Sequence, residues 1–163
     1  MLFGHLAIVA LQHRYLKTEL VPTAIAGLFP DLVDKTLCQV LHLTPSGRML
    51  GHTLLGLALS TVAAGLSGGK KRAWSWALGY AGHLLGDLGG PVPWLYPFVP
   101  YDFPYAPSGL WEILRQGLSD RKEVAIELAL VAWAILALGW SVIQGRLPTP
   151  ARANPPPHDK RTP

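Results

Sequence analysis

The chain has 163 residues, of which 50% are hydrophobic and only 15% are charged, and its mean hydropathy is +0.27. This length suits one domain, and the hydrophobic content excludes a disordered chain. A soluble domain carries about 25% charged residues, so we expect the excess apolar surface to lie in lipid. The single cysteine, Cys38, excludes an intramolecular disulfide and a site built from paired thiolates.

The chain begins with two short apolar segments, residues 2–11 and 20–33. Both are shorter than the roughly 20 residues that cross a bilayer, so we expect interfacial, re-entrant or buried helices. The first segment does not fit a signal peptide. It has no basic start, it contains His5, and no small-residue cleavage site follows it.

Three later segments are candidate membrane spans: residues 50–66, 73–88 and 124–143. The last is the clearest, because residues 128–143 carry no charge. The first two are shorter and contain polar residues, so they could be tilted, partly sunk, or a hairpin packed against other helices. We therefore predict an all-α integral membrane protein with about three to four membrane-spanning or embedded helices, as one domain over residues 1–146.

Basic residues predict the orientation of these spans. They gather in the loop at residues 70–72 and in the tail, and both regions should face the cytoplasm, with residues 91–123 on the other side. The net charge of +4 then indicates topology in a cytoplasmic (inner) membrane. Because no zinc-finger, RRM or helix-turn-helix signature is present, no nucleic-acid partner is predicted.

The segment at residues 91–107 alternates prolines with aromatic residues and is expected to form neither helix nor central strand. It could be an interfacial loop or a lid over a site at the lipid surface. Ser108 is predicted to cap a short interfacial helix with Leu110, Ile113, Leu114 and Leu118 on its apolar face. The Pro-rich tail at residues 147–163 is predicted to be disordered.

Ionisable side chains in apolar segments are costly and are therefore candidates for function. The candidates are all histidine or aspartate: His5, Asp31, Asp34, His52, His83 and Asp87. These are ligands that zinc, manganese and iron accept, and zinc is the first choice. His83 and Asp87 are four residues apart, so a helix would place them on one face. Pro30 suits a helix start, which would put Asp31 and Asp34 in a first turn.

Each of these residues also has a simpler interpretation. His52 could be a packing or hydrogen-bonding residue, and the Asp31 region could be a helix cap. His83 and Asp87 could form a buried hydrogen-bonded pair that joins two helices. A single metal centre, however, accounts for all six residues together.

The order of four motifs, GH near the start, then LFPDLVD, GRMLGHTLLG and WALGYAGHLLGD, resembles the YdjM-like family of inner-membrane metal-dependent hydrolases. The resemblance covers about residues 1–90. It implies a helical membrane protein whose metal ligands are the six residues above. More distantly, the chain is similar to the zinc-dependent phospholipase C and nuclease group, although it has one His-x-x-x-Asp pair where that group uses two.

The chemistry implied is hydrolysis by a metal-activated water, with a phosphoester or phospholipid as substrate at the bilayer surface. Asp34 or Asp87 could take the proton from the water. Arg48, four residues before His52, could share a helical face with it and stabilise charge on a phosphate, or it could simply snorkel at the membrane edge. The alternative function is a non-catalytic membrane protein, either a metal or ion carrier or an assembly partner.

Overall fold

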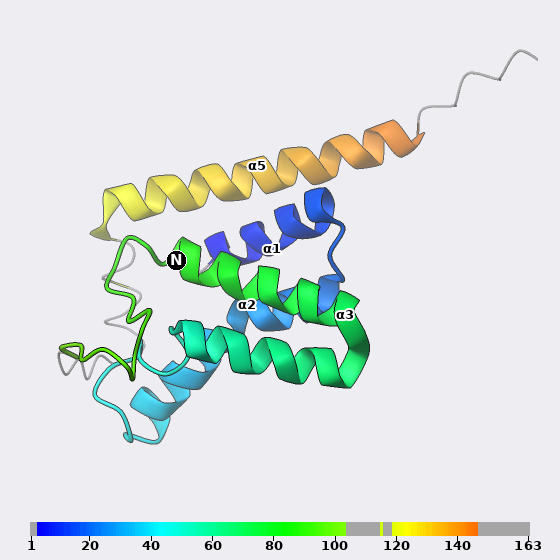
Figure 1. Cartoon of the computed structure of the whole chain (residues 1–163). Helices are drawn as coiled ribbons and strands as arrows, with labels where there is room; N and C mark the ends of the chain where they lie inside the picture. Colours follow the sequence, from blue (N-terminus) through cyan, green and yellow to red (C-terminus); the bar gives the residue numbers. More distant parts are fainter. Residues whose placement is uncertain (1–2, 104–114, 116–118, 147–163) are drawn as a thin grey trace, which may run out of the picture.

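The computed structural model describes residues 3–103, 115 and 119–146 of the chain. In this part of the chain all regular elements are helical: α1 (Phe3–Leu16), α2 (Leu20–Lys35), a π-helical turn η1 (Thr36–Val40), α3 (Leu54–Gly86) and α5 (Arg121–Arg146) (Figure 1). The all-α prediction is therefore confirmed. The predicted helix after Ser108 and the tail at residues 147–163 lie outside the described residues.

Helix α3 is a helical hairpin, because its backbone breaks at two glycines. Gly68 has φ −153° and ψ 16°, and Gly69 has φ 77°, a left-handed conformation that glycine adopts without strain. The two arms run antiparallel on either side of this break (Figure 1). At the start of the first arm, Thr53 is the N-cap, and its Oγ1 accepts a hydrogen bond of 2.9 Å from the Gly56 N–H.

The α3 hairpin packs against α2 around a small apolar core of Ala26, Tyr80, Leu84 and Val92. Small residues bring the helices close together. A Cβ atom at Gly79 would lie 2.3 Å from the backbone oxygen of Thr23, so glycine is required for this approach. Because Val92 belongs to this core, the start of the proline-rich segment packs on the bundle.

The helix ends gather at two opposite ends of the bundle (Figure 1). At one end, the turn between α1 and α2 meets the break in α3, and Lys71 Nζ lies 3.8 Å from Glu19 Oε1. At the other end lie the start of α1, the end of α2 and both ends of α3. This second end carries most of the histidine and aspartate residues singled out above.

Helix α5 packs on α1 and on no other described helix. Ala7, Leu11 and Ala134 form the buried part of that contact. The remaining surface of α5 is exposed and apolar, with Leu136 71% exposed and Trp140 60% exposed. This helix could cross a membrane, because Arg121–Trp140 is a 20-residue segment that contains an 18-residue window with a mean hydropathy of 1.8.

The prediction of about three to four membrane-spanning or embedded helices is confirmed for the helices but not for that number of spans. In the described part of the chain, α5 is the one helix that is both long and apolar enough to span. The segments predicted at residues 50–66 and 73–88 are the two arms of α3, and the break at Gly68 leaves each arm shorter than the roughly 20 residues that cross a bilayer.

Glu127 of α5 caps the first turn of α1. Its Oε1 accepts hydrogen bonds from the N–H groups of Phe3 and Gly4, the latter at 2.9 Å. The first N–H groups of a helix have no intrahelical partner, and a carboxylate there is favoured by the helix dipole. Glu127 lies near the start of α5, but its side chain caps a different helix.

We expect Glu127→Ala to lower the free energy of unfolding by about 1–2 kcal/mol, because two N–H groups of α1 lose their acceptor. The measurement is chemical denaturation in detergent micelles. The matched control is Glu123→Ala, which removes a carboxylate one turn earlier in the same helix and should cost less than half as much. Equal losses from the two variants would contradict the capping role.

Candidate metal centre

Four side chains converge at the end of the bundle opposite the break in α3. Asp31 lies near the C-terminal end of α2, and His52 lies in the turn before α3. His83 lies in the last turn of α3, and Asp87 follows directly after that helix. One ligand atom from each side chain lies within 4.8 Å of the other three, so this cluster could hold a metal ion.

The separations between these ligand atoms suit a single ion. His52 Nε2 lies 3.2 Å from both His83 Nε2 and Asp87 Oδ2. His83 Nε2 lies 3.7 Å from Asp87 Oδ2, and Asp31 Oδ1 lies 3.7 Å and 3.9 Å from the two imidazole nitrogens. Ligand atoms around a tetrahedral zinc ion are about 3.3–3.6 Å apart, given bond lengths of about 2.0–2.2 Å. The five separations given above lie within a few tenths of an ångström of these values, and the sixth, between Asp31 and Asp87, lies within 4.8 Å.

The hydrogen bond at Nδ1 of each imidazole orients the ring so that Nε2 faces the cluster. His83 Nδ1 lies 2.7 Å from the carbonyl oxygen of Gly27, and His52 Nδ1 lies 2.8 Å from Asp34 Oδ2. Both partners are acceptors, so both Nδ1 atoms carry a proton and donate it. In the neutral rings, each Nε2 therefore presents a lone pair to the cluster. Metal-binding histidines are commonly oriented in this way by a carbonyl or carboxylate on the second nitrogen.

With both rings neutral, this arrangement places lone pairs against one another in a buried space. The two Nε2 atoms face each other at 3.2 Å, with carboxylate oxygens of Asp31 and Asp87 beside them. His52, His83 and Asp87 are 0%, 1% and 4% exposed, so water screens their mutual repulsion poorly. A cation at the centre would relieve this repulsion, which is why the donor set fits a metal ion.

Asp34 is fully buried and accepts four hydrogen bonds. Its Oδ1 accepts from the Gly51 N–H at 2.7 Å, and its Oδ2 accepts from the N–H groups of Met49 and His52 and from His52 Nδ1. Burial alone would raise the pKa of the Asp34 carboxyl, but the hydrogen bonds from His52, Gly51 and Met49 outweigh it and lower the pKa. Asp34 is therefore an ionised carboxylate that holds His52 and the turn around it.

The helix position predicted for the two aspartates is wrong. Pro30 lies inside α2 instead of at its start, so Asp31 and Asp34 lie near its C-terminal end, where the helix dipole opposes negative charge. Other donors replace the dipole. Lys35 Nζ lies 2.6 Å from Asp31 Oδ2, and the 49–52 segment supplies N–H groups to Asp34.

Arg48 reaches the cluster without belonging to a helix, contrary to the predicted helical face shared with His52. Its Nη2 lies 3.2 Å from Asp87 Oδ1, while Asp87 Oδ2 faces the histidines. The arginine side chain is 31% exposed, whereas that of Asp87 is 3% exposed. Arg48 therefore links the buried carboxylate to the surface of the protein.

His5 lies beside the four-residue cluster but outside it. Its ring stacks on that of His83, with centroids 4.1 Å apart and an interplanar angle of 16°. His5 Nε2 lies 3.5 Å from Asp87 Oδ1, which is longer than a normal hydrogen bond, and this buried atom has no hydrogen-bond partner among the described residues. Of the six predicted ligands, four thus meet at one point, while Asp34 and His5 flank it.

The cluster opens toward Asp31. Its side chain is 21% exposed, and its partner Lys35 is 42% exposed, whereas the other ligands are buried. Lys35 was not among the predicted site residues, although its spacing of four residues from Asp31 was a usable signal. The carbonyl oxygen of Gly27, which orients His83, left no signal in the sequence because any residue could supply it.

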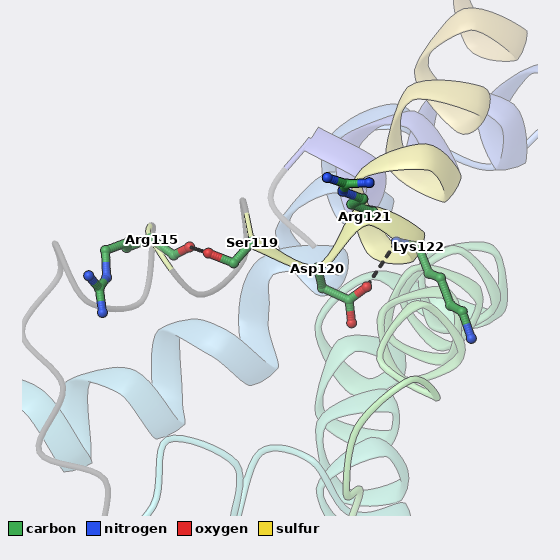
Figure 2. Close-up of a pocket in the computed structure, with 5 residues that line it drawn as sticks. All are labelled: Arg115, Ser119, Asp120, Arg121 and Lys122. Carbon is green, nitrogen blue, oxygen red and sulfur yellow. Dashed lines mark hydrogen bonds between the residues drawn. The ribbon is translucent and has the colours of Figure 1, made fainter.

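A hollow of about 680 Å³ lies away from the cluster, at the start of α5 (Figure 2). Its lining includes Arg115, Arg121 and Lys122, and Figure 2 shows their side chains pointing in different directions. Asp120 there is engaged as a helix cap, since its Oδ1 accepts from the Lys122 N–H at 2.8 Å. Diverging cations around an open hollow do not form a site, so the candidate centre is the histidine–aspartate cluster.

The comparisons with known proteins agree with the membrane character of the chain. The family model described as "YdjM inner membrane protein" matches residues 1–147. No curated protein and no solved structure matches the chain. The match covers every residue of the histidine–aspartate cluster as well as α5.

Proposed function

The chain belongs to the YdjM inner membrane protein family, and from this membership and its cluster of ligands we propose that it is a membrane-bound, metal-dependent hydrolase. The observation that carries the proposal is the convergence of two imidazole Nε2 atoms, 3.2 Å apart, beside two carboxylate oxygens. A divalent cation is the partner that all four atoms share. Zinc suits the two imidazoles best, and manganese or iron would also accept this set.

In this proposal Asp31, His52, His83 and Asp87 hold the ion. Asp34, which was also a predicted ligand, orients His52, because its oxygens already accept hydrogen bonds. His5, the sixth predicted ligand, buttresses His83 by stacking on it. Four protein ligands leave a catalytic zinc without a free tetrahedral position, so Asp31, the most exposed of the four, is the ligand that would yield to water.

When bound, a divalent ion supplies an acidified water for attack on an ester. Asp34 and Asp87 are the two candidate bases. Both oxygens of Asp34 accept hydrogen bonds, and the two oxygens of Asp87 lie 3.2 Å from His52 Nε2 and Arg48 Nη2, so either carboxylate would exchange a partner to take the proton. Arg48 holds Asp87 in place at 3.2 Å, and its side chain is 31% exposed. From there it would bind a phosphoryl oxygen and stabilise charge that develops on it.

The charge of the site favours an anionic substrate. The carboxylates of Asp31, Asp34 and Asp87 are matched by the cations of Lys35 and Arg48, which leaves one negative charge. A divalent ion would make the site net positive by one charge. Substrate approaching along the exposed Asp31 side would meet this positive field, which suits a phosphoester such as a phospholipid headgroup.

We place the site at the non-cytoplasmic face of an inner membrane. The basic residues at 70–72 and the C-terminal tail would lie in the cytoplasm, and the metal cluster lies at the opposite end of the bundle (Figure 1). Helix α5 would span the bilayer, and the other helices would be embedded beside it. All four ligands gather at one end of the bundle, which supports a single surface site over a carrier, whose polar groups would be spread across the bilayer depth.

The test is hydrolysis by detergent-purified protein that has been stripped of metal and then reloaded with zinc, manganese or iron(II). We expect cleavage of bis(p-nitrophenyl) phosphate or of phosphatidylglycerol by the reloaded protein alone, and a loss of about 100-fold or more in His52→Ala. The control is His42→Asn, because His42 is exposed and asparagine tolerates its positive φ of 51°. Protein that binds metal without cleaving any phosphoester would instead be the non-catalytic metal carrier or assembly partner.

A further inference from the structure

A groove of about 580 Å³ lies at the basic end of the bundle, far from the metal cluster. It runs between the start of α2 and the break in α3, and its apolar lining includes Leu20, Val21, Ile25 and Trp76. The first three are at least half exposed, at 50%, 66% and 50%. The indole N–H of Trp76 donates to Ser60 Oγ at 3.0 Å, so its polar atom is satisfied inside the bundle and the ring is left as an apolar wall.

One edge of this apolar groove is strongly basic. Arg72 lines it, and Lys70 and Lys71 are its exposed neighbours at the α3 break. The acidic residue on the same edge, Glu19, lies 3.8 Å from Lys71 Nζ. In the part of the chain that the structure describes, no carboxylate forms an ion pair with Lys70 or Arg72. Arg72, whose Nη1 also donates to the Ser67 carbonyl oxygen at 3.4 Å, and the neighbouring Lys70 are therefore the cations closest in sequence to the groove lining that have no carboxylate partner among the described residues.

We propose that this groove binds one anionic phospholipid. Its acyl chain would lie along Leu20, Val21 and Ile25, and its phosphate and anionic headgroup would be bound by Arg72 and Lys70. The observations match the two halves of such a lipid: an exposed apolar channel, and cations at only one end of it. The positive-inside rule assigns the basic end of the bundle to the cytoplasmic side. Arg72 and Lys70 would then lie level with the lipid headgroups of the cytoplasmic leaflet.

The test is native mass spectrometry of the full chain in detergent, titrated with phosphatidylglycerol or with phosphatidylethanolamine of identical acyl chains. We expect the wild type to bind the first phosphatidylglycerol about tenfold more tightly than phosphatidylethanolamine. Lys70→Gln with Arg72→Gln should bring this ratio close to one. Ile25→Trp, which fills the groove and keeps the charge, should weaken binding of the first molecule of either lipid.

The matched control is Arg121→Gln with Lys122→Gln, which removes two exposed cations at the opposite end of the bundle and should keep the tenfold preference. Equal affinity of the wild type for both lipids would overturn the proposal. So would an equal loss of preference in the control, because that result would mean attraction by net charge. The metal content of every variant should match that of the wild type. The lipid titration therefore tests the groove independently of the metal cluster.

Discussion

His83→Ala should emerge from purification without a metal ion, whereas we expect the wild-type protein to carry one. The substitution removes one of four ligand atoms and opens a cavity beside the other three, so the ion loses both a bond and its geometry. We expect metal content, measured by inductively coupled plasma mass spectrometry, to fall from about one ion per chain to a tenth of that or less. Asp87→Asn should behave in the same way.

His42→Asn is the matched control for this prediction, and it should retain the wild-type metal content. Circular dichroism would establish that each variant keeps its helices. A folded wild-type protein that takes up no zinc, manganese or iron after reconstitution would overturn the metal centre and the hydrolase proposal with it. The converging side chains would then be polar groups that join the helix ends.

Asp34→Asn should cause the largest loss of stability in this end of the bundle. An amide has one acceptor oxygen where the carboxylate has two, so its NH2 group would face at least one of the N–H donors of Met49, Gly51 and His52. Leaving buried donors without acceptors costs about 1–3 kcal/mol each, and we expect the free energy of unfolding to fall by about 3 kcal/mol or more.

The same variant distinguishes a positioning role from a purely structural one. Without the carboxylate on Nδ1, His52 is free to change tautomer, and we expect metal affinity to fall by about 10–100-fold in protein that is still folded. Asp31→Asn is the comparison, because it alters a partly exposed ligand and should weaken metal binding with little loss of stability. Unchanged metal affinity in folded Asp34→Asn would restrict Asp34 to holding the turn.

The part of the site that could be predicted from the sequence was the part held within one helix. His83 and Asp87 are four residues apart, and helical geometry alone brings them together, as observed at 3.7 Å. Their burial in an apolar segment marked them as functional candidates. Pairing them with Asp31 and His52 required tertiary structure, because three separate segments meet there.

The direction of the second helix was not predictable from its local sequence. Proline commonly starts a helix, so Pro30 favoured a first turn for Asp31 and Asp34. The apolar run before it extends the helix upstream instead, and α2 carries Pro30 inside it. Hydrogen bonds from residues 49–52, which lie far along the chain, then stabilise Asp34 at a helix end that its own dipole disfavours.

The number of membrane spans was also not predictable from the sequence alone. Apolar composition identified most of residues 50–66 and 73–88 correctly as helical, although α3 begins at Leu54 and ends at Gly86. The basic residues at 70–72, predicted as the loop, are helical and directly follow the break at Gly68 and Gly69. Hydropathy does not report whether a helix is surrounded by lipid or by other helices. Ser75, Tyr80 and His83 are 0%, 0% and 1% exposed because α1 and α2 cover them. Only α5, which contacts α1 alone, has the exposed apolar surface of a single span.

The ligands of the cluster come from chain segments that are distant in sequence, and this has a consequence for assembly. Asp31, His52 and His83 sit at the ends of different helical arms, so an ion bound to all three cross-links the arms at one end, while the Gly68–Gly69 turn joins two of them at the other. In such a bundle the binding energy of the ion becomes folding energy. Helices that have already formed would be drawn together last at their metal end, so that completion of the tertiary fold would follow the local supply of metal.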